Sequence, residues 1–261
     1  MIKYKHPMQF KKQIILFTIT ILFIANCSEN KKVEEKIKPD IYGHWLLESL
    51  LNYADSAKSI LGHKQFFCSE IIISPKLDSI TIVNGDLEYW KTKFDSISET
   101  EISLEHLSHM PHSNLFLTED NKLTYYDSAA GKPFYFIKIP NNPIAKVNID
   151  LPAMKYQINK SLFEHQFTDL ETNKTVSFTG FNEIKGLKEF TNYQTFINND
   201  YTDMSEDNLM ELSHKKTKVK KLTIWKFSQD TLKLYTTINT ECKECKPFYE
   251  KGVVWKTLLK K

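Results

Sequence analysis

Residues 80–90 read Ile-Thr-Ile-Val-Asn-Gly-Asp-Leu-Glu-Tyr-Trp and contain the strongest local signal for the fold. Ile80–Val83 is rich in β-branched residues, and the run after Asn84-Gly85 ends in two aromatic residues. β-Branched and aromatic side chains favour strands. Asn-Gly readily adopts the positive φ angles of a type I′ hairpin turn. The stretch therefore predicts two antiparallel strands joined by a tight turn.

The same pattern recurs in both halves of the chain. Turn-like segments at 119–121, 129–132 and 228–230 each separate two strand-like runs. The expected strand pairs are Leu115–Thr118 with Leu123–Tyr126, Tyr125–Asp127 with Phe134–Ile139, and Leu222–Phe227 with Leu232–Thr236, and Val253–Leu259 closes the chain. Many short strands at close spacing predict an all-β, mainly antiparallel fold, either a barrel or a sandwich.

One short helix is expected, near Met204–His214. Asp203 and Glu206 form a capping-box pattern there, ahead of a segment that contains two leucines and a methionine. Such a pattern is typical of a helix N-terminus.

A weak internal repeat bears on the domain organisation. Residues 116–126 and 225–235 each place an acidic turn between two strands, and a glycine and a final strand follow in both halves. The repeat predicts two tandem β units, 41–141 and 144–261, each a barrel or sandwich. A single large β domain over 41–261 is the alternative.

The first 28 residues have the pattern of an export signal. Lys11-Lys12-Gln13 precede Ile14–Ala25, an apolar run of twelve residues that only two threonines interrupt. A basic start followed by a short apolar segment is typical of a secretory signal peptide. The run is shorter than the ~20 apolar residues that a membrane-spanning helix needs.

The end of this signal, Ile24-Ala25-Asn26-Cys27, resembles the lipobox of bacterial lipoproteins. The resemblance implies that residues 1–26 are removed as a signal peptide and that Cys27 receives fatty acyl chains such as palmitate. Several such chains would anchor the protein stably in a membrane. Residues 27–40 would then form a flexible tether in the bacterial cell envelope, facing the periplasm or the exterior. An ordinary secretory signal with an incidental Cys27, and an uncleaved anchor, are the alternatives.

Cleavage before Cys27 changes the charge of the chain. The whole sequence has 35 basic and 32 acidic side chains, and the signal holds four lysines and no acidic residue. The mature chain therefore has 35 − 4 = 31 basic and 32 acidic groups, a net charge of −1. Every basic residue is a lysine, which disfavours sites that need the bidentate fork of arginine. Nucleic acid is not an expected partner.

Ile41-Tyr42-Gly43-His44-Trp45, followed by strand-like Leu46–Leu50, resembles the opening of lipocalin-like domains. Segments 228–235 and 255–258 are similar to the terminal strands of small lipocalin-like lipoproteins. The resemblance implies a barrel whose mouth or interior binds something apolar. Trp45, Tyr89 and Tyr126 are the candidate ligand-binding residues.

The remaining cysteines are Cys68, Cys242 and Cys245. Thiols outside the cytoplasm tend to oxidise, so Cys242 and Cys245 favour a disulfide that staples a loop between two late strands. A redox role and a zinc site are the alternatives. Cys68, in a strand-like apolar segment, is expected to be a small buried hydrophobe.

His106, His109 and His112 recur every three residues and form a weak candidate metal site. Imidazoles at this spacing can bind Zn²⁺ or Cu²⁺. Pro111 would break a helix that aligned them, so a solvated loop is the simpler interpretation. No metal or cofactor is predicted.

Motifs of common enzymes are missing from the sequence, which contains no Gly-x-Ser-x-Gly, His-Glu-x-x-His or phosphate-binding loop. The sequence favours a lipid-anchored β-barrel-like protein that binds a small apolar ligand or an envelope protein partner and performs no chemistry of its own. A structural or interaction lipoprotein of an envelope assembly is the alternative. A hydrolase is a third possibility, and it would need converging carboxylates, one with a raised pKa.

Overall fold

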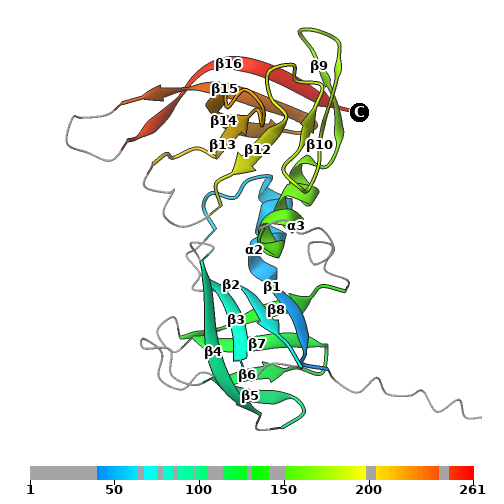
Figure 1. Cartoon of the computed structure of the whole chain (residues 1–261), viewed down its shortest axis with the longest axis vertical. Helices are drawn as coiled ribbons and strands as arrows, with labels where there is room; N and C mark the ends of the chain where they lie inside the picture. The colour runs from blue at the N-terminus through cyan, green and yellow to red at the C-terminus, as the bar shows by residue number, and fades with distance from the viewer. Residues whose placement is uncertain are drawn as a thin grey trace, which may run out of the picture. The chain divides into compact units, whose positions relative to one another are not determined.

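The computed structural model describes residues 40–63, 68–75, 79–84, 88–96, 98–104, 114–127, 131–140, 151–197, 204–240 and 247–261. All of these residues belong to one compact unit, residues 39–261. The chain within this unit is mainly antiparallel β structure arranged in two eight-stranded sheets (Figure 1). The predicted all-β, antiparallel fold class is therefore confirmed.

The first sheet is a closed barrel in which each strand pairs with the next and β8 pairs with β1. Its strands are β1 (Gly43–Leu47), β2 (Cys68–Ile73), β3 (Ser79–Asn84), β4 (Tyr89–Ser96), β5 (Glu101–Leu104), β6 (Asn114–Leu117), β7 (Lys122–Asp127) and β8 (Lys132–Lys138). Alternate residues face the interior, because successive side chains of a strand point to opposite faces. Ile80, Ile82, Leu115, Leu123 and Phe136 are buried there in one hydrophobic cluster.

The hairpin predicted over residues 80–90 is present as β3 and β4, with Val83 opposite Tyr89. The prediction of a two-residue turn at Asn84-Gly85 is wrong. The Asn84 N–H donates to the Glu88 carbonyl at 3.0 Å, and three residues separate this hydrogen-bonded pair. The Asn84 side chain accepts a second hydrogen bond from the Glu88 N–H at 2.7 Å. Asn84 therefore closes the ladder instead of occupying the turn.

Three further predicted hairpins are confirmed as β6–β7, β7–β8 and β14–β15. In each turn one residue adopts a positive φ angle: Asn121 at 57°, Gly131 at 62° and Gln229 at 52°. Such left-handed positions match the turn to the twist of the flanking strands.

The second sheet follows the order β11-β10-β9-β16-β15-β14-β13-β12. Its strands are β9 (Gln166–Asp169), β10 (Thr175–Phe178), β11 (Ile184–Lys185), β12 (Asn192–Thr195), β13 (Leu209–Ser213), β14 (Lys220–Ser228), β15 (Thr231–Asn239) and β16 (Tyr249–Lys260). A bridge between Glu183 and Asn192 and a hydrogen bond from the Ile184 N–H to the Thr191 carbonyl join the two ends of this order. The sheet is therefore barrel-like, with sequential strands as neighbours.

The internal repeat seen in the sequence falls on equivalent strands. Residues 116–126 cover the β6–β7 hairpin and residues 225–235 the β14–β15 hairpin, which are the sixth and seventh strands of their sheets. The two-unit division at 41–141 and 144–261 stays a prediction, because the compact unit spans both sheets.

The helix predicted near Met204–His214 is wrong. Leu209–Ser213 is strand β13, which pairs with β12 on one side and β14 on the other. Asp203 of the expected capping box lies outside the described residues, and the hydroxyl of Ser205 beside it donates to the Tyr249 carbonyl at 2.7 Å, which ties this segment to β16. Two neighbouring strands supply more hydrogen bonds and burial than an isolated helix offers, and tertiary context overrides the local pattern.

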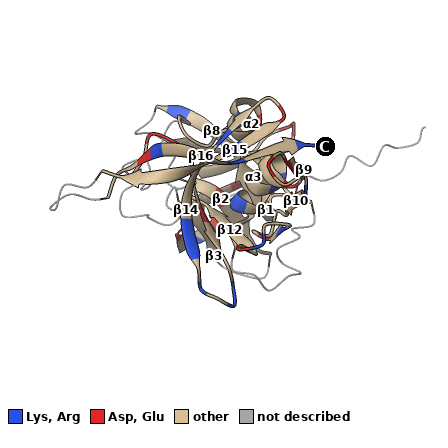
Figure 2. Cartoon of the chain, turned by 90° about the horizontal axis from the view of Figure 1, so that it is seen from above, with Lys and Arg blue, Asp and Glu red and all other residues tan. Residues whose placement is uncertain are grey.

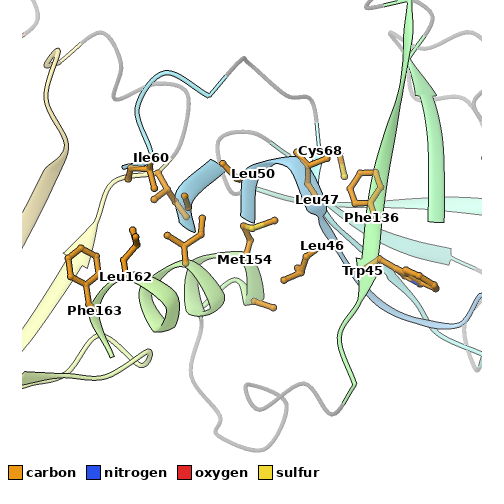
Figure 3. Close-up of a cluster of buried hydrophobic side chains, with 14 of the residues drawn as sticks. Trp45, Leu46, Leu47, Leu50, Ile60, Cys68, Phe136, Met154, Leu162 and Phe163 are labelled. Carbon is orange, nitrogen blue, oxygen red and sulfur yellow. The ribbon is translucent and has the colours of Figure 1, made fainter. Parts of the chain in front are cut away.

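Two helices occur elsewhere in the described residues, α2 (Glu48–Ala57) and α3 (Ala153–Phe163). The strand expected over Leu46–Leu50 ends at Leu47, and α2 begins at the next residue, Glu48. Leu50 and Ala54, one turn apart, are the buried residues of α2. Leu50 and Met154 lie where α2 and α3 meet (Figure 3).

Helix α3 contributes an aromatic side chain to the hydrophobic core that the second sheet covers. Phe163 packs edge to face on Trp225, with ring centroids 4.9 Å apart, and also contacts Phe178 and Tyr193. Such edge contacts add about 0.5–1.5 kcal/mol beyond the buried area. The helix thus supplies part of the core of this sheet.

Candidate functional site

The candidate site is a cleft of about 390 Å³ on the second sheet. Three segments build it: the β9–β10 turn, the loop after β11 and the middle of β16. Its lining residues are Asp169, Glu171, Thr172, Lys174, Gly186, Leu187, Lys188, Glu189, Phe190, Trp255 and Lys256. The volume falls in the lower part of the ~300–1,000 Å³ range of small-molecule sites.

The apolar part of the cleft consists of Leu187, Phe190 and Trp255. The Phe190 and Trp255 rings meet edge to face at 90°, with centroids 5.8 Å apart. The Lys221 ammonium lies over the Trp255 ring, 4.3 Å from its centroid. Because Lys221 and Phe190 both hold the indole, its orientation is fixed without a ligand.

The polar wall is organised around Lys256 of β16. Its ammonium lies 3.2 Å from Asp169 Oδ2 and 2.5 Å from Glu171 Oε2. Asp169 also accepts hydrogen bonds from the Glu171 N–H at 3.0 Å and the Thr172 hydroxyl at 2.9 Å. The β9–β10 turn is therefore tied to β16 across the cleft wall.

These contacts shift the pKa values of both charged partners. Burial alone would raise the pKa of Asp169, but hydrogen bonds from Glu171, Thr172 and Lys256 outweigh it and lower the pKa. The hydrogen bond to Glu171 is the main cause that raises the pKa of Lys256, and Asp169 adds to it. Both groups are therefore held in their charged forms at neutral pH.

Gly186 shapes the loop that forms the opposite side of the cleft. Its φ angle is +92°, and a Cβ at this position would overlap the Thr175 carbonyl of β10. Only glycine lets the backbone pass this closely in that conformation. Leu187–Phe190 are thereby held against the sheet.

Charge in the cleft is balanced. Three lysines (Lys174, Lys188, Lys256) face three acidic residues (Asp169, Glu171, Glu189). Away from the cleft, Lys215, Lys216 and Lys218 gather in the turn that leads into β14 (Figure 2). The site offers donors and acceptors in similar number and no strong net field.

The predicted ligand-binding aromatic residues do not come together. Trp45 faces the interior of the first barrel, where it is fully buried and its Nε1–H donates to the Ile41 carbonyl at 2.9 Å. Tyr89 and Tyr126 are 49% and 53% exposed. Tyr126 follows the buried Tyr125 along β7 and so points to the outer face. The three side chains therefore line no common cavity.

A buried carboxylate lies on the outer face of the first barrel. Glu70 Oε2 is 2.7 Å from His44 Nε2, and Glu70 Oε1 accepts a hydrogen bond from the Met154 N–H at 2.7 Å. Met154 is in the first turn of α3, where N–H groups lack partners within the helix and attract negative charge. Glu70 therefore fastens α3 to β2, which is a structural role.

Several predicted residues fall outside the described part of the chain: Cys27 with its signal and tether, Cys242 and Cys245, and His106, His109 and His112. Cys68 is a buried free thiol, as predicted, and burial raises its pKa. Among the described residues no group of three or more His, Cys, Asp or Glu side chains is arranged to hold a metal ion.

The sequence contained the cleft residues but no signal that united them. Asp169 and Glu171 belong to no motif in the sequence, and Trp255 and Lys256 were expected only as part of the final strand. They meet because β16 pairs with β9, with Leu258 opposite Asp169. Because β9 and β16 are far apart in the sequence, no local pattern indicates that they pair.

No protein-family model matches the chain, and comparisons with curated proteins and with solved structures also give no match. In the described part of the chain, neither helix has the length and apolar character required to cross a membrane. Function must therefore be argued from the residues themselves.

Proposed function

We propose that this protein is an exported, lipid-anchored binding protein that performs no chemistry of its own. Cys27 carries the acyl chains, and the cleft beside Trp255 holds a small ligand at the cell envelope. The cleft is the observation that carries the proposal, because it combines a preformed apolar surface with convergent polar groups.

The packing of the first barrel supports a site outside its interior. Inward-facing residues such as Ile82, Leu115 and Phe136 belong to one buried hydrophobic cluster. A ligand there would have to displace side chains from a close-packed core. An external cleft requires no such rearrangement, so we propose the ligand site on the second sheet and not in the interior of the first barrel.

The chemistry of the cleft favours binding over hydrolysis. A general acid needs a carboxyl group whose pKa is raised toward neutrality. Asp169 has a lowered pKa, and three hydrogen-bond donors occupy its oxygens. Lys256 is likewise held by two carboxylates. These groups suit a rigid wall better than a proton-transfer pair.

An interaction role is the second candidate, and the β15–β16 hairpin favours it. Val253 is 73% exposed, and Val254 and Ile238 are about half exposed on the same hairpin. Several exposed aliphatic side chains on one hairpin are a feature of protein contact sites. This surface would serve a partner in an envelope assembly.

Native mass spectrometry of the full chain, purified from its own membrane, tests the proposal. We expect acyl mass on the peptide that contains Cys27, and a second mass that is released on denaturation. Trp255→Ala should lose the released mass and keep the acyl mass. An unmodified Cys27 contradicts the anchor. A chain without releasable mass, or equal release from Trp255→Ala, contradicts the cleft and favours the interaction role.

A further inference from the structure

We propose that the cleft recognises a neutral saccharide, one or two sugar rings in size. This inference rests on the proposed binding function and adds the chemical class of the ligand. It follows from three properties of the cleft: an aromatic surface, a balanced set of hydrogen-bonding groups, and a rigid frame.

The aromatic surface suits the apolar face of a sugar ring. Trp255 is partly exposed and offers its ring to the cleft, whereas Phe190 is only 2% exposed and supports the indole from below at a right angle. The faces of aromatic rings carry partial negative charge, so they attract the C–H bonds on one side of a pyranose. A purely aliphatic ligand would cover the same indole but would gain nothing from the polar side chains of the lining.

The polar groups match hydroxyl groups, each of which is donor and acceptor at once. Lys174 and Lys188 supply donors and Glu189 supplies an acceptor, and none of the three makes an ion pair with another described residue. The lining side chains sum to zero charge. A strongly anionic or cationic ligand would therefore gain little from the site as a whole.

The frame is set before any ligand arrives. Lys256 is locked between Asp169 and Glu171, while Lys221 and Phe190 hold the Trp255 ring. Gly186 keeps the facing loop close to β10. Weak individual contacts to a sugar add up best where little side-chain entropy is lost on binding, and the Trp255 ring and Lys256 meet that condition.

The size of the cleft limits the ligand. Its volume of about 390 Å³ lies near the lower bound for small-molecule sites and is open on one side. One or two rings fit, and a longer glycan would extend into solvent.

The test is a titration of the full chain, held in a zwitterionic detergent without a sugar headgroup. The probes are cellobiose, lactose and N,N′-diacetylchitobiose, with glucuronate and alanyl-alanine as charged and zwitterionic comparators. Calorimetry and saturation-transfer NMR measure binding. We expect at least one disaccharide to bind saturably, and more tightly than both comparators.

Variants assign the binding to the cleft. Trp255→Ala should lower the affinity for the disaccharide by about tenfold or more, which is the effect expected from the loss of one stacked ring. Trp255→Phe keeps a ring face and should restore part of the affinity. Tyr89→Ala removes an exposed aromatic of the first barrel and should leave the affinity unchanged. Circular dichroism and the melting temperature show whether each variant is folded.

The outcomes separate the two proposals. If no disaccharide binds while Trp255→Ala still loses a co-purified mass, the saccharide assignment fails and the binding function stands. If alanyl-alanine binds more tightly than every disaccharide, the saccharide assignment also fails. Equal disaccharide affinity in wild type and folded Trp255→Ala overturns the cleft as the site.

Discussion

Lys256 Nζ of β16 lies 3.2 Å from Asp169 Oδ2 of β9, and this contact joins the last strand of the chain to the first strand of its sheet. Asp169 is only 3% exposed. A carboxylate so deeply buried depends on its partners, because water cannot replace them.

Replacing Lys256 with methionine should destabilise the protein by about 1–3 kcal/mol, because the buried Asp169 carboxylate loses its cation. Chemical denaturation of the full chain measures the free energy of unfolding. Lys226→Met, an exposed lysine on β14, is the matched control and should change stability by less than about 0.5 kcal/mol. Equal effects of the two substitutions would argue against the role of this contact.

The lowered pKa of Asp169 should make stability depend on acid pH. A carboxyl whose folded pKa lies below its unfolded value stabilises the protein above the unfolded pKa. That contribution is lost as pH falls through the folded pKa, so wild-type stability should drop between about pH 5 and pH 2. Asp169→Asn should flatten this part of the stability curve. An unchanged slope in the variant would show that other carboxyls cause the acid loss.

Lys155 of α3 should produce a trend of the same sign at alkaline pH. Burial lowers its pKa from 10.5 to about 8. The unfolded chain therefore holds a proton that the folded chain has released between these two values, and stability should rise as pH increases from 8 to 10.5. Lys155→Met should remove this rise and stabilise the protein at pH 7 by about 1–3 kcal/mol.

Lys160→Met is the control for Lys155, since Lys160 is exposed on the same helix. It should leave the pH profile of unfolding unchanged between pH 8 and about 10. A profile that Lys155→Met does not alter would mean that the lysine keeps its proton in the folded chain.

Two glycines with positive φ angles allow steric overlap to be separated from backbone strain. Gly131 has a φ angle of 62° and open space around its Cα, whereas Gly186 has a φ angle of 92° and faces the Thr175 carbonyl. Gly131→Ala should cost about 1–2 kcal/mol, from the left-handed conformation alone. Gly186→Ala should cost at least ~2 kcal/mol more, because the loop must move. Thermal unfolding compares them, and similar melting temperatures would contradict the overlap.

The β structure could be predicted where the local pattern and the tertiary fold agree. The Asn121, Gly131 and Gln229 turns carry their own conformational preferences, and alternating apolar residues such as Ile80 and Ile82 mark a buried face. Each signal acts within a few residues, so it can be read without knowledge of the partner strand. The paired hairpins β6–β7 and β14–β15 were visible for the same reason.

The cleft could not be predicted in this way. Gly186, Trp255 and Asp169 share no motif and lie far apart in the sequence, and their meeting depends on how β16 pairs with β9. Tyr89 and Tyr126 were chosen by residue type, without knowledge of which face of the barrel they occupy, and the structure does not bring them together with Trp45.

The all-β class, most hairpins and the burial of Cys68 follow from local patterns, because hydrophobic periodicity and turn chemistry act over a few neighbouring residues. Tertiary structure alone decided that Leu209–Ser213 is a strand, that Glu48 begins a helix, and that a charged wall faces Trp255. Those outcomes depend on hydrogen-bond partners and burial supplied by distant segments. Local preference is worth only a fraction of that energy, so it yields wherever the two conflict.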